Sequence, residues 1–301
     1  MKAPPSTMHV YMIALAAGFL PILLGMINIF LAIIFLIITD CIWLLYIGRI
    51  EYCERKYEPL EASYILLNTF FIFLLTSIIR VLSISLLNWP LEKAAIFILS
   101  TGLIIAEGYS LVEFGYGTKN LLKQLIYGIL LSNYIFVVFI GSLMMLYYIS
   151  YSSFLNISIN LEILLITLPF YLTVGLGEES LFRGYIERNA VISMGYRKGI
   201  LWASILFGLW HIYWHIRPLN PVGMFIHVAF SFCFGILLGI IYEKTNSILV
   251  VTLIHATWDT FISALEYPVL GLQLEMTTII IAFLLLFGVI TLSKERFEKL
   301  L

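Results

Sequence analysis

Two adjacent glutamates and two histidines in apolar surroundings are the residues of this sequence best suited to chemistry. Glu178 and Glu179 lie in the run GEESLFRG. His211 ends the run FGLWH, and His255 begins the run HATWD. Ionisable side chains inside apolar helices are costly and usually functional. We therefore expect the three runs to meet at one site.

Helical spacing gives the two glutamates different roles. Glu179 and Arg183 are four residues apart, so they face the same side of a helix and can form an ion pair. Glu178 points about 100° away from that side and lacks this partner. His255 and Asp259 share a helix face by the same spacing. One glutamate can therefore be structural while its neighbour does chemistry.

The residue types predict hydrolysis. A carboxylate held away from water can act as a general base, so Glu178 and His211 could hold and deprotonate a water molecule. His255, oriented by Asp259, could donate a hydrogen bond to a developing oxyanion. Glu178, His211 and His255 are also candidate zinc ligands, although the zinc-protease signature HExxH is absent. The residues leave open both a divalent metal such as zinc and a metal-free glutamate mechanism.

The composition requires a membrane around these residues. Of 301 residues, 61% are hydrophobic and 12% are charged, whereas soluble domains are about a quarter charged. A net charge of −1 without a basic stripe argues against a nucleic-acid partner. We expect a multi-pass protein of the cell membrane.

Ten apolar runs are long enough to cross a bilayer as helices, which takes about 17–25 residues. They predict an all-α transmembrane bundle of about ten spans, with eight as the lower bound. The predicted spans are 8–25, 28–48, 63–87, 93–112, 122–149, 162–187, 199–215, 222–242, 248–265 and 276–292.

The basic residues orient this bundle. With ten spans, 13 of the 17 Lys and Arg residues fall on one side of the membrane, and only Lys93 and Arg217 fall on the other. The positive-inside rule then places both termini in the cytoplasm. Glu178, His211 and His255 would lie roughly 12–18 Å from the basic loops. The spacing therefore predicts a site in the cytoplasmic half of the bilayer.

The motifs together resemble a known family. EExxxR at 178–183, FxxxH at 207–211, a glycine-spaced helix at 234–248 and HxxxD at 255–259 are similar to the CAAX-protease and bacteriocin-processing family. These intramembrane proteases are also called CPBP or ABI proteins, and they include the type II CAAX prenyl endopeptidase. The resemblance covers roughly residues 162–265.

The resemblance implies roles for these residues. It assigns Glu178 and His211 to the catalytic water, and His255 and Asp259 to the oxyanion pocket. Supporting residues are implied at Glu179, Arg183 and Phe207. The position of Asp259 is usually asparagine in the prenyl endopeptidases, which weakens the case for a CAAX substrate more than the case for hydrolysis.

We therefore expect three regions and one activity. Residues 1–160 form transmembrane helices of unknown role, residues 161–268 form the catalytic helical core, and residues 269–301 form a last helix and a cytoplasmic tail. The activity is hydrolysis of a peptide bond in a membrane-associated peptide or an (iso)prenylated protein. A bacteriocin-immunity or peptide-maturation protease is the alternative within the family. A transporter with a buried ion path is the alternative from another class.

Other buried ionisable residues have weaker predictions. His215 is interpreted as an interfacial histidine and His227 as a histidine bonded to a neighbouring helix. Asp40, Arg80 and Glu107 could pair or line a substrate path, and the sequence does not pair them.

Overall fold

A computed structural model describes residues 5–48, 61–216, 219–268 and 272–292. The predicted C-terminal tail after residue 292 and Arg217 lie outside these residues. Within the described ranges the protein is all-α apart from one short pair of strands.

The elements follow one another as a series of helices joined by turns. In chain order they are α1 (Pro5–Gly25), α2 (Ile29–Ile47), α3 (Ala62–Leu87), α4 (Lys93–Ala106), α5 (Leu121–Tyr151), β1 (Ser158–Ile159), α6 (Leu161–Glu179), the π-helix η1 (Ser180–Glu187), α7 (Arg188–Met194), α8 (Tyr196–Trp210), α9 (Tyr213–Ile216), α10 (Pro221–Thr245), α11 (Ile248–Ala264), β2 (Leu265–Glu266) and α12 (Leu272–Leu292).

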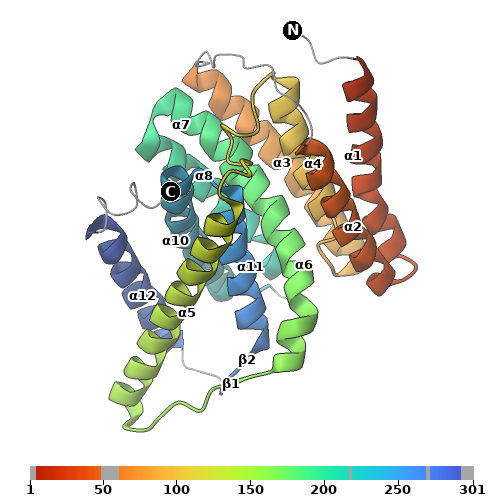
Figure 1. The fold of residues 1–301 in the computed structure, drawn as a ribbon. Coiled ribbons are helices and arrows are strands. Elements are labelled where there is room, and N and C mark those ends of the chain that lie inside the picture. The colour runs from red at the N-terminus through yellow and green to blue at the C-terminus, as the bar shows by residue number, and fades with distance from the viewer. Residues whose placement is uncertain (1–4, 49–60, 217–218, 269–271, 293–301) are drawn as a thin grey trace.

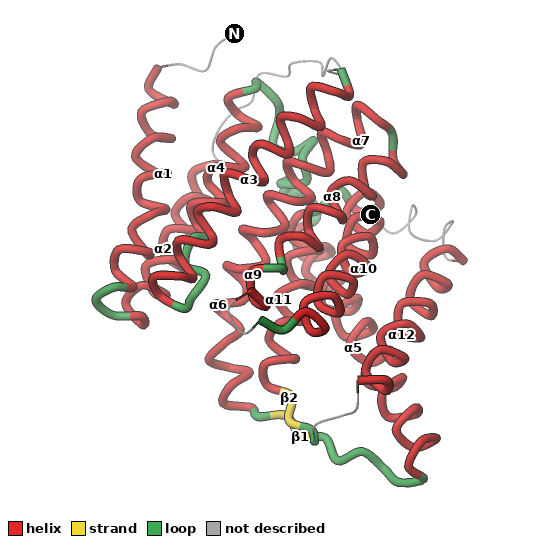
Figure 2. The backbone as a smooth tube through the Cα atoms, turned by 180° about the vertical axis from the view of Figure 1, so that it is seen from behind, coloured by secondary structure: helices red, strands yellow, loops and turns green. Residues whose placement is uncertain are grey.

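The long helices run alternately up and down the bundle (Figures 1 and 2). The antiparallel pair β1–β2 joins the start of α6 to the end of α11, with Ser158 opposite Glu266 and Ile159 opposite Leu265. These two helices pack against each other along their lengths. The strand pair therefore marks one end of the bundle, and the α7–α8 turn marks the opposite end.

The bundle has the character of a membrane protein. Five helical segments are long and apolar enough to cross a bilayer, judged by length and composition: Ile29–Ile47, Ala62–Leu87, Leu121–Tyr151, Leu161–Met194 and Pro221–Thr245. Four shorter segments are also apolar. The outer faces of α3 and α5 expose large apolar side chains such as Phe71 and Leu122, which lipid would cover. The count of ten spans and the cytoplasmic termini stay predictions.

Helix boundaries follow local signals in the sequence. The long apolar block 8–48 is two helices, as predicted, because the Asn28 side chain accepts a hydrogen bond from the Leu31 N–H and caps α2. The predicted span 93–112 ends earlier, at Ala106. Gly108 there adopts φ +84°, and the Tyr109 N–H bonds the Ile104 carbonyl, which is a glycine-type helix end.

The sixth predicted span is longer than expected and is not a uniform α-helix. It continues to Met194 through the π-helical turns of η1, which begin directly after Glu179. π-Helical turns are rare and often occur at functional sites. The first turn of this element carries Arg183, whose guanidinium bonds both Glu179 and the Gly235 carbonyl of α10. The change in winding therefore lies where the helix meets its charged partners.

Helix α4 lies inside the bundle. Its residues Ala94 to Ile98 are at most 1% exposed, and its neighbours are α1, α2, α6 and η1. Gly177 of α6 allows a close approach, because a Cβ there would lie 2.8 Å from the Lys93 carbonyl oxygen. This contact fixes the start of α4 beside the paired glutamates of α6.

We predict that Gly177→Ala destabilises the protein by about 1–3 kcal/mol, the usual cost of overpacking a buried contact. The added methyl group meets backbone, which cannot swing aside. Gly141→Ala on α5 is the control, because no atom lies within 4 Å of a Cβ at that position. Thermal unfolding in detergent compares the two variants. Equal stability of both would contradict the packing described for α4 and α6.

Candidate active site

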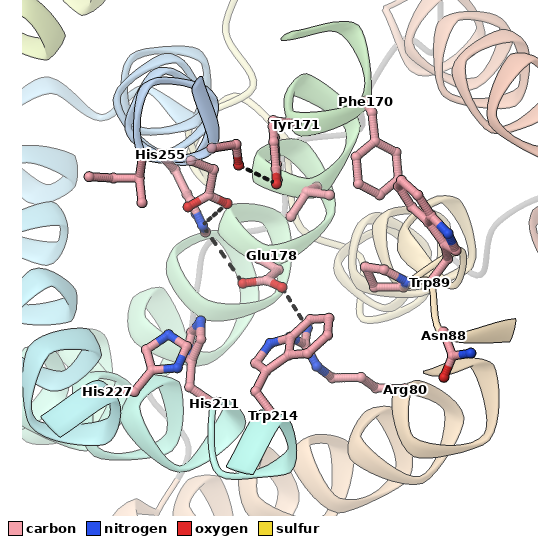
Figure 3. Close-up of a pocket in the computed structure, with 15 residues that line it drawn as sticks. Arg80, Asn88, Trp89, Phe170, Tyr171, Glu178, His211, Trp214, His227 and His255 are labelled. Carbon is pink, nitrogen blue, oxygen red and sulfur yellow. Dashed lines mark hydrogen bonds and ion pairs between the residues drawn. The ribbon is translucent and has the colours of Figure 1, made fainter. Parts of the chain in front are cut away.

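The sequence-predicted residues line one cavity of about 370 Å³. Figure 3 shows this cavity among α3, α6, α8, α10 and α11, with Glu178 near its centre. The lining includes six ionisable side chains: Arg80, Glu178, His211, His227, His255 and Asp259. Groups that are far apart in the sequence therefore share one cavity.

Glu178 is buried and has one engaged and one free carboxylate oxygen. Its Oε1 atom accepts hydrogen bonds from Arg80 Nη1 at 2.7 Å, Lys93 Nζ at 2.8 Å and Trp210 Nε1 at 2.9 Å. Its Oε2 atom has no hydrogen-bond partner in the described part of the chain. Three donors on Oε1 hold the side chain rigidly, which leaves Oε2 as the oxygen available to a substrate or a water molecule.

Glu178 belongs to a group of four buried charges that balance one another. Arg80 from α3 and Lys93 from α4 carry two positive charges, and Glu178 and Glu92 carry two negative ones. Lys93 Nζ lies 2.8 Å from Glu92 Oε1, and Arg80 Nη1 lies 3.9 Å from the same oxygen. All four side chains are at most 4% exposed. Buried charges are tolerated when each has a partner, so this quartet accounts for the burial of Glu178.

The two glutamates diverge as the helical spacing predicts. Glu179 Oε2 lies 3.2 Å from Arg183 Nε, and Glu179 Oε1 lies 2.6 Å from His255 Nδ1. Glu178 faces the cavity instead. Glu179 thus joins α6 to α11 through His255, a contact that the sequence did not indicate.

His255 is held among three carboxylates. Besides the bond from Nδ1 to Glu179, its Nε2 atom lies 3.5 Å from Asp259 Oδ2 and 3.9 Å from Glu178 Oε2. Carboxylate oxygens only accept hydrogen bonds. Both ring nitrogens of His255 therefore face acceptors, and Nε2 is placed to act as a donor toward the cavity.

His211 caps the end of α8 and has a defined tautomer. Its Nδ1 atom lies 2.8 Å from the Phe207 carbonyl oxygen. A carbonyl cannot donate, so Nδ1 carries the proton and the neutral ring keeps an acceptor at Nε2. The Phe207 ring packs edge-on against His211 and His255, with centroids 4.9 and 5.7 Å away. Phe207 therefore orients both imidazoles.

The structure also brings residues to the site that the sequence did not assign there. Lys93 was assigned to the start of a predicted span, on the side of the membrane opposite the termini, but it is fully buried. Trp210, which the sequence did not assign to the site, donates a hydrogen bond to Glu178. His227 lines the cavity beside His211. The Nδ1 atom of His227 lies 3.0 Å from the Nε2 atom of His215. His215 therefore has a histidine partner, a contact that an interfacial position did not predict.

Other residues singled out in the sequence lie elsewhere. Glu107 accepts a hydrogen bond from the Tyr185 hydroxyl at 2.6 Å. Asp40 is buried on α2, and neither of its carboxylate oxygens has a hydrogen-bond partner in the described ranges. Neither carboxylate is among the residues that line the cavity.

The cavity extends from Glu178 toward the strand pair. Glu178 lies near the midpoint of the helical segment 161–194, and the lining continues to Tyr171 and Ser263 near the strand pair. Toward the basic end, Phe182 and Glu187 are fully buried and are not part of the lining, which ends at Glu178 on this segment. The position of the site in the cytoplasmic half of the bilayer stays a prediction.

The donor set does not fit a metal ion. Within the described residues, no three His, Cys, Asp or Glu side chains are grouped so that they could hold one. Glu178 Oε1 is taken by two cations and an indole, and His255 Nδ1 by Glu179. Two cations at the carboxylate also oppose a divalent ion electrostatically.

Comparison with known protein families finds a match for the segment that carries most of this site. Residues 160–261 match a family described as type II CAAX prenyl endopeptidase Rce1-like. This match confirms the resemblance to the CAAX-type intramembrane proteases, and it supports a membrane-embedded protease at the level of the family. No curated protein and no solved structure matches the chain.

The charge quartet generates a stability prediction. Lys93→Met leaves two buried carboxylates with one cation, and removal of one partner of a buried ion pair costs about 3–5 kcal/mol. The double variant Glu92→Gln/Lys93→Met restores the balance, so we expect it to be more stable than Lys93→Met alone. Thermal unfolding in detergent measures both variants. A double variant no more stable than the single one would contradict the proposed balance.

Proposed function

We propose that this protein is an intramembrane endopeptidase that hydrolyses a peptide bond of a membrane-associated protein or peptide. One observation carries the proposal: a single cavity is lined by Glu178, His211, His255 and Asp259, within the segment that matches the CAAX prenyl endopeptidases. Neither a nucleophilic serine nor a cysteine is needed for this chemistry.

The proposed reaction begins with a water molecule between two acceptors. Glu178 Oε2 and His211 Nε2 can each accept one hydrogen bond from it, which directs its lone pair toward a substrate carbonyl. Glu178 takes a proton as the water attacks the carbonyl carbon. The arrangement that supports this step is the free Oε2 atom beside an engaged Oε1.

The second part of the reaction uses His255. Its Nε2 atom would donate to the oxyanion of the tetrahedral intermediate, while Glu179 and Asp259 hold the ring in place. As the carbon–nitrogen bond breaks, Glu178 returns its proton to the leaving amine. The net reaction consumes one water molecule and one peptide bond, and Glu178 is regenerated as the carboxylate.

We expect Glu178→Gln, His211→Ala and His255→Ala each to lower peptidase activity by about 10²–10⁴-fold or more, the usual contribution of general acid–base groups. Purified protein and a fluorogenic peptide in detergent or liposomes provide the measurement. Glu113→Gln is the matched control, because this exposed glutamate lies on the loop after α4. Full activity in Glu178→Ala would end the proposal, provided that the variant is folded.

A second candidate within the family is a bacteriocin-immunity or peptide-maturation protease. Asp259, only 3.5 Å from His255, stands where the resemblance implies asparagine in prenyl endopeptidases, and this difference favours the second candidate. We therefore expect matched peptides with and without a prenyl group to be cleaved at similar rates. A strict requirement for the prenyl group, measured as kcat/KM, would instead support a prenyl-protein processor.

A transporter is the alternative from another class. Arg80, Lys93, Glu92 and Glu178 pair with one another inside the bundle, as expected of a fixed structural cluster. Proton-coupled flux in liposomes, without peptidase activity, would favour the transporter instead.

A further inference from the structure

The catalytic cavity leads toward one end of the bundle. On α6, its lining runs from Glu178 back through Val174 to Tyr171, each about a turn nearer the start of the helix. On α11, the lining runs from His255 forward to Ser263, near the end of the helix. Because β1 and β2 join that start to that end, both walls lead to the same end.

The mouth of the cavity has an aromatic and polar rim. Trp89, in the turn between α3 and α4, is 39% exposed, and Trp214 of α9 is 38% exposed. Asn88 and Ser263 are exposed beside them. Tryptophan is enriched where a membrane protein crosses from lipid to water. This rim has the composition expected at a membrane interface.

The ends of the bundle differ in charge. Six Lys and Arg residues are not buried within the described ranges, and all lie in or beside the turns at the end opposite the mouth: Lys119, Lys123, Arg188, Arg197, Lys198 and Lys244. Around the strand pair, the described charged side chains that reach the surface are acidic, namely Glu162, Glu266 and Glu275. The positive-inside rule places the basic end in the cytoplasm.

We propose that the catalytic cavity receives its substrate from the non-cytoplasmic face of the membrane. The inference rests on the proposed peptidase activity for its chemistry, and on the cavity's direction and the charge asymmetry for its geometry. The substrate class is a peptide or membrane-attached segment that reaches the outer leaflet, by export or from outside the cell. A C-terminal tail held in the cytoplasm would meet the closed end of the site.

Site-directed cysteine labelling tests this orientation without using catalysis. Cys41, Cys53 and Cys233 are first replaced by serine. Single cysteines are then introduced by Asn88→Cys and Ser263→Cys at the mouth, and by Lys119→Cys and Lys198→Cys at the basic end. Intact bacterial cells that express each variant are treated with a membrane-impermeant sulfonated maleimide. Parallel samples are labelled after permeabilisation and after solubilisation, to show that each thiol is reactive.

We expect the two mouth variants to be labelled in intact cells, and the two basic-end variants only after permeabilisation. The reverse pattern would overturn the proposal. Absence of labelling at the mouth in intact cells, with normal labelling after solubilisation, would also overturn it. If the variant without native cysteines does not fold, the same cysteines are introduced into the native sequence. The labelling of each introduced cysteine is then the increase over the labelling of the unsubstituted protein.

Adding Glu178→Gln to each variant separates this proposal from the proposed function. Labelling should not change, because Glu178 lies inside the cavity and not at its rim. A peptide added outside intact cells should be cleaved by the wild-type protein and not by Glu178→Gln. Mouth labelling without peptidase activity under any condition would refute the peptidase and leave the orientation standing.

Discussion

The structure depends on keeping Glu178 charged and paired away from water. An isolated carboxylate in a low-dielectric interior is very unfavourable, so a buried glutamate needs cations and donors around it. Arg80, Lys93 and Trp210 meet this need from three different helices. The positions of α3 and α4 against α6 are therefore part of the site, although the family match begins only at residue 160.

The same constraint separates the functions of the adjacent glutamates. Glu179 is used on both oxygens, by Arg183 and His255, and it holds α6, the π-helix and α11 in register. Glu178 is used on one oxygen only. The two neighbouring carboxylates thus have different partners, and only Glu178 keeps an oxygen that can bind a substrate or a water molecule.

Much of this arrangement could be predicted from local spacing, and the rest could not. The apolar runs gave the helices closely, and four-residue spacing correctly paired Glu179 with Arg183 and His255 with Asp259. The contacts of Arg80 and Lys93 with Glu178 join segments 98 and 85 residues apart, and no helical periodicity encodes such contacts. Lys93 is the first residue of a predicted span, so it was expected at the membrane surface and not inside the bundle. The continuation of the sixth helical segment through α7 to Met194 was also missed, because the predicted span ended at residue 187.

Two of the helices beside the cavity are unusually short. Helix α4 has 14 residues and α8 has 15, which makes each about 21–23 Å long, while the hydrocarbon core is about 30 Å thick. Both reach the cavity at the same end, one beginning at Lys93 and the other stopping before His211. Such shortness favours a local thinning of the bilayer. Where the bilayer is thinned, the headgroup layer lies closer to Glu178. A scissile peptide bond could then reach the Glu178 carboxylate without crossing much hydrocarbon.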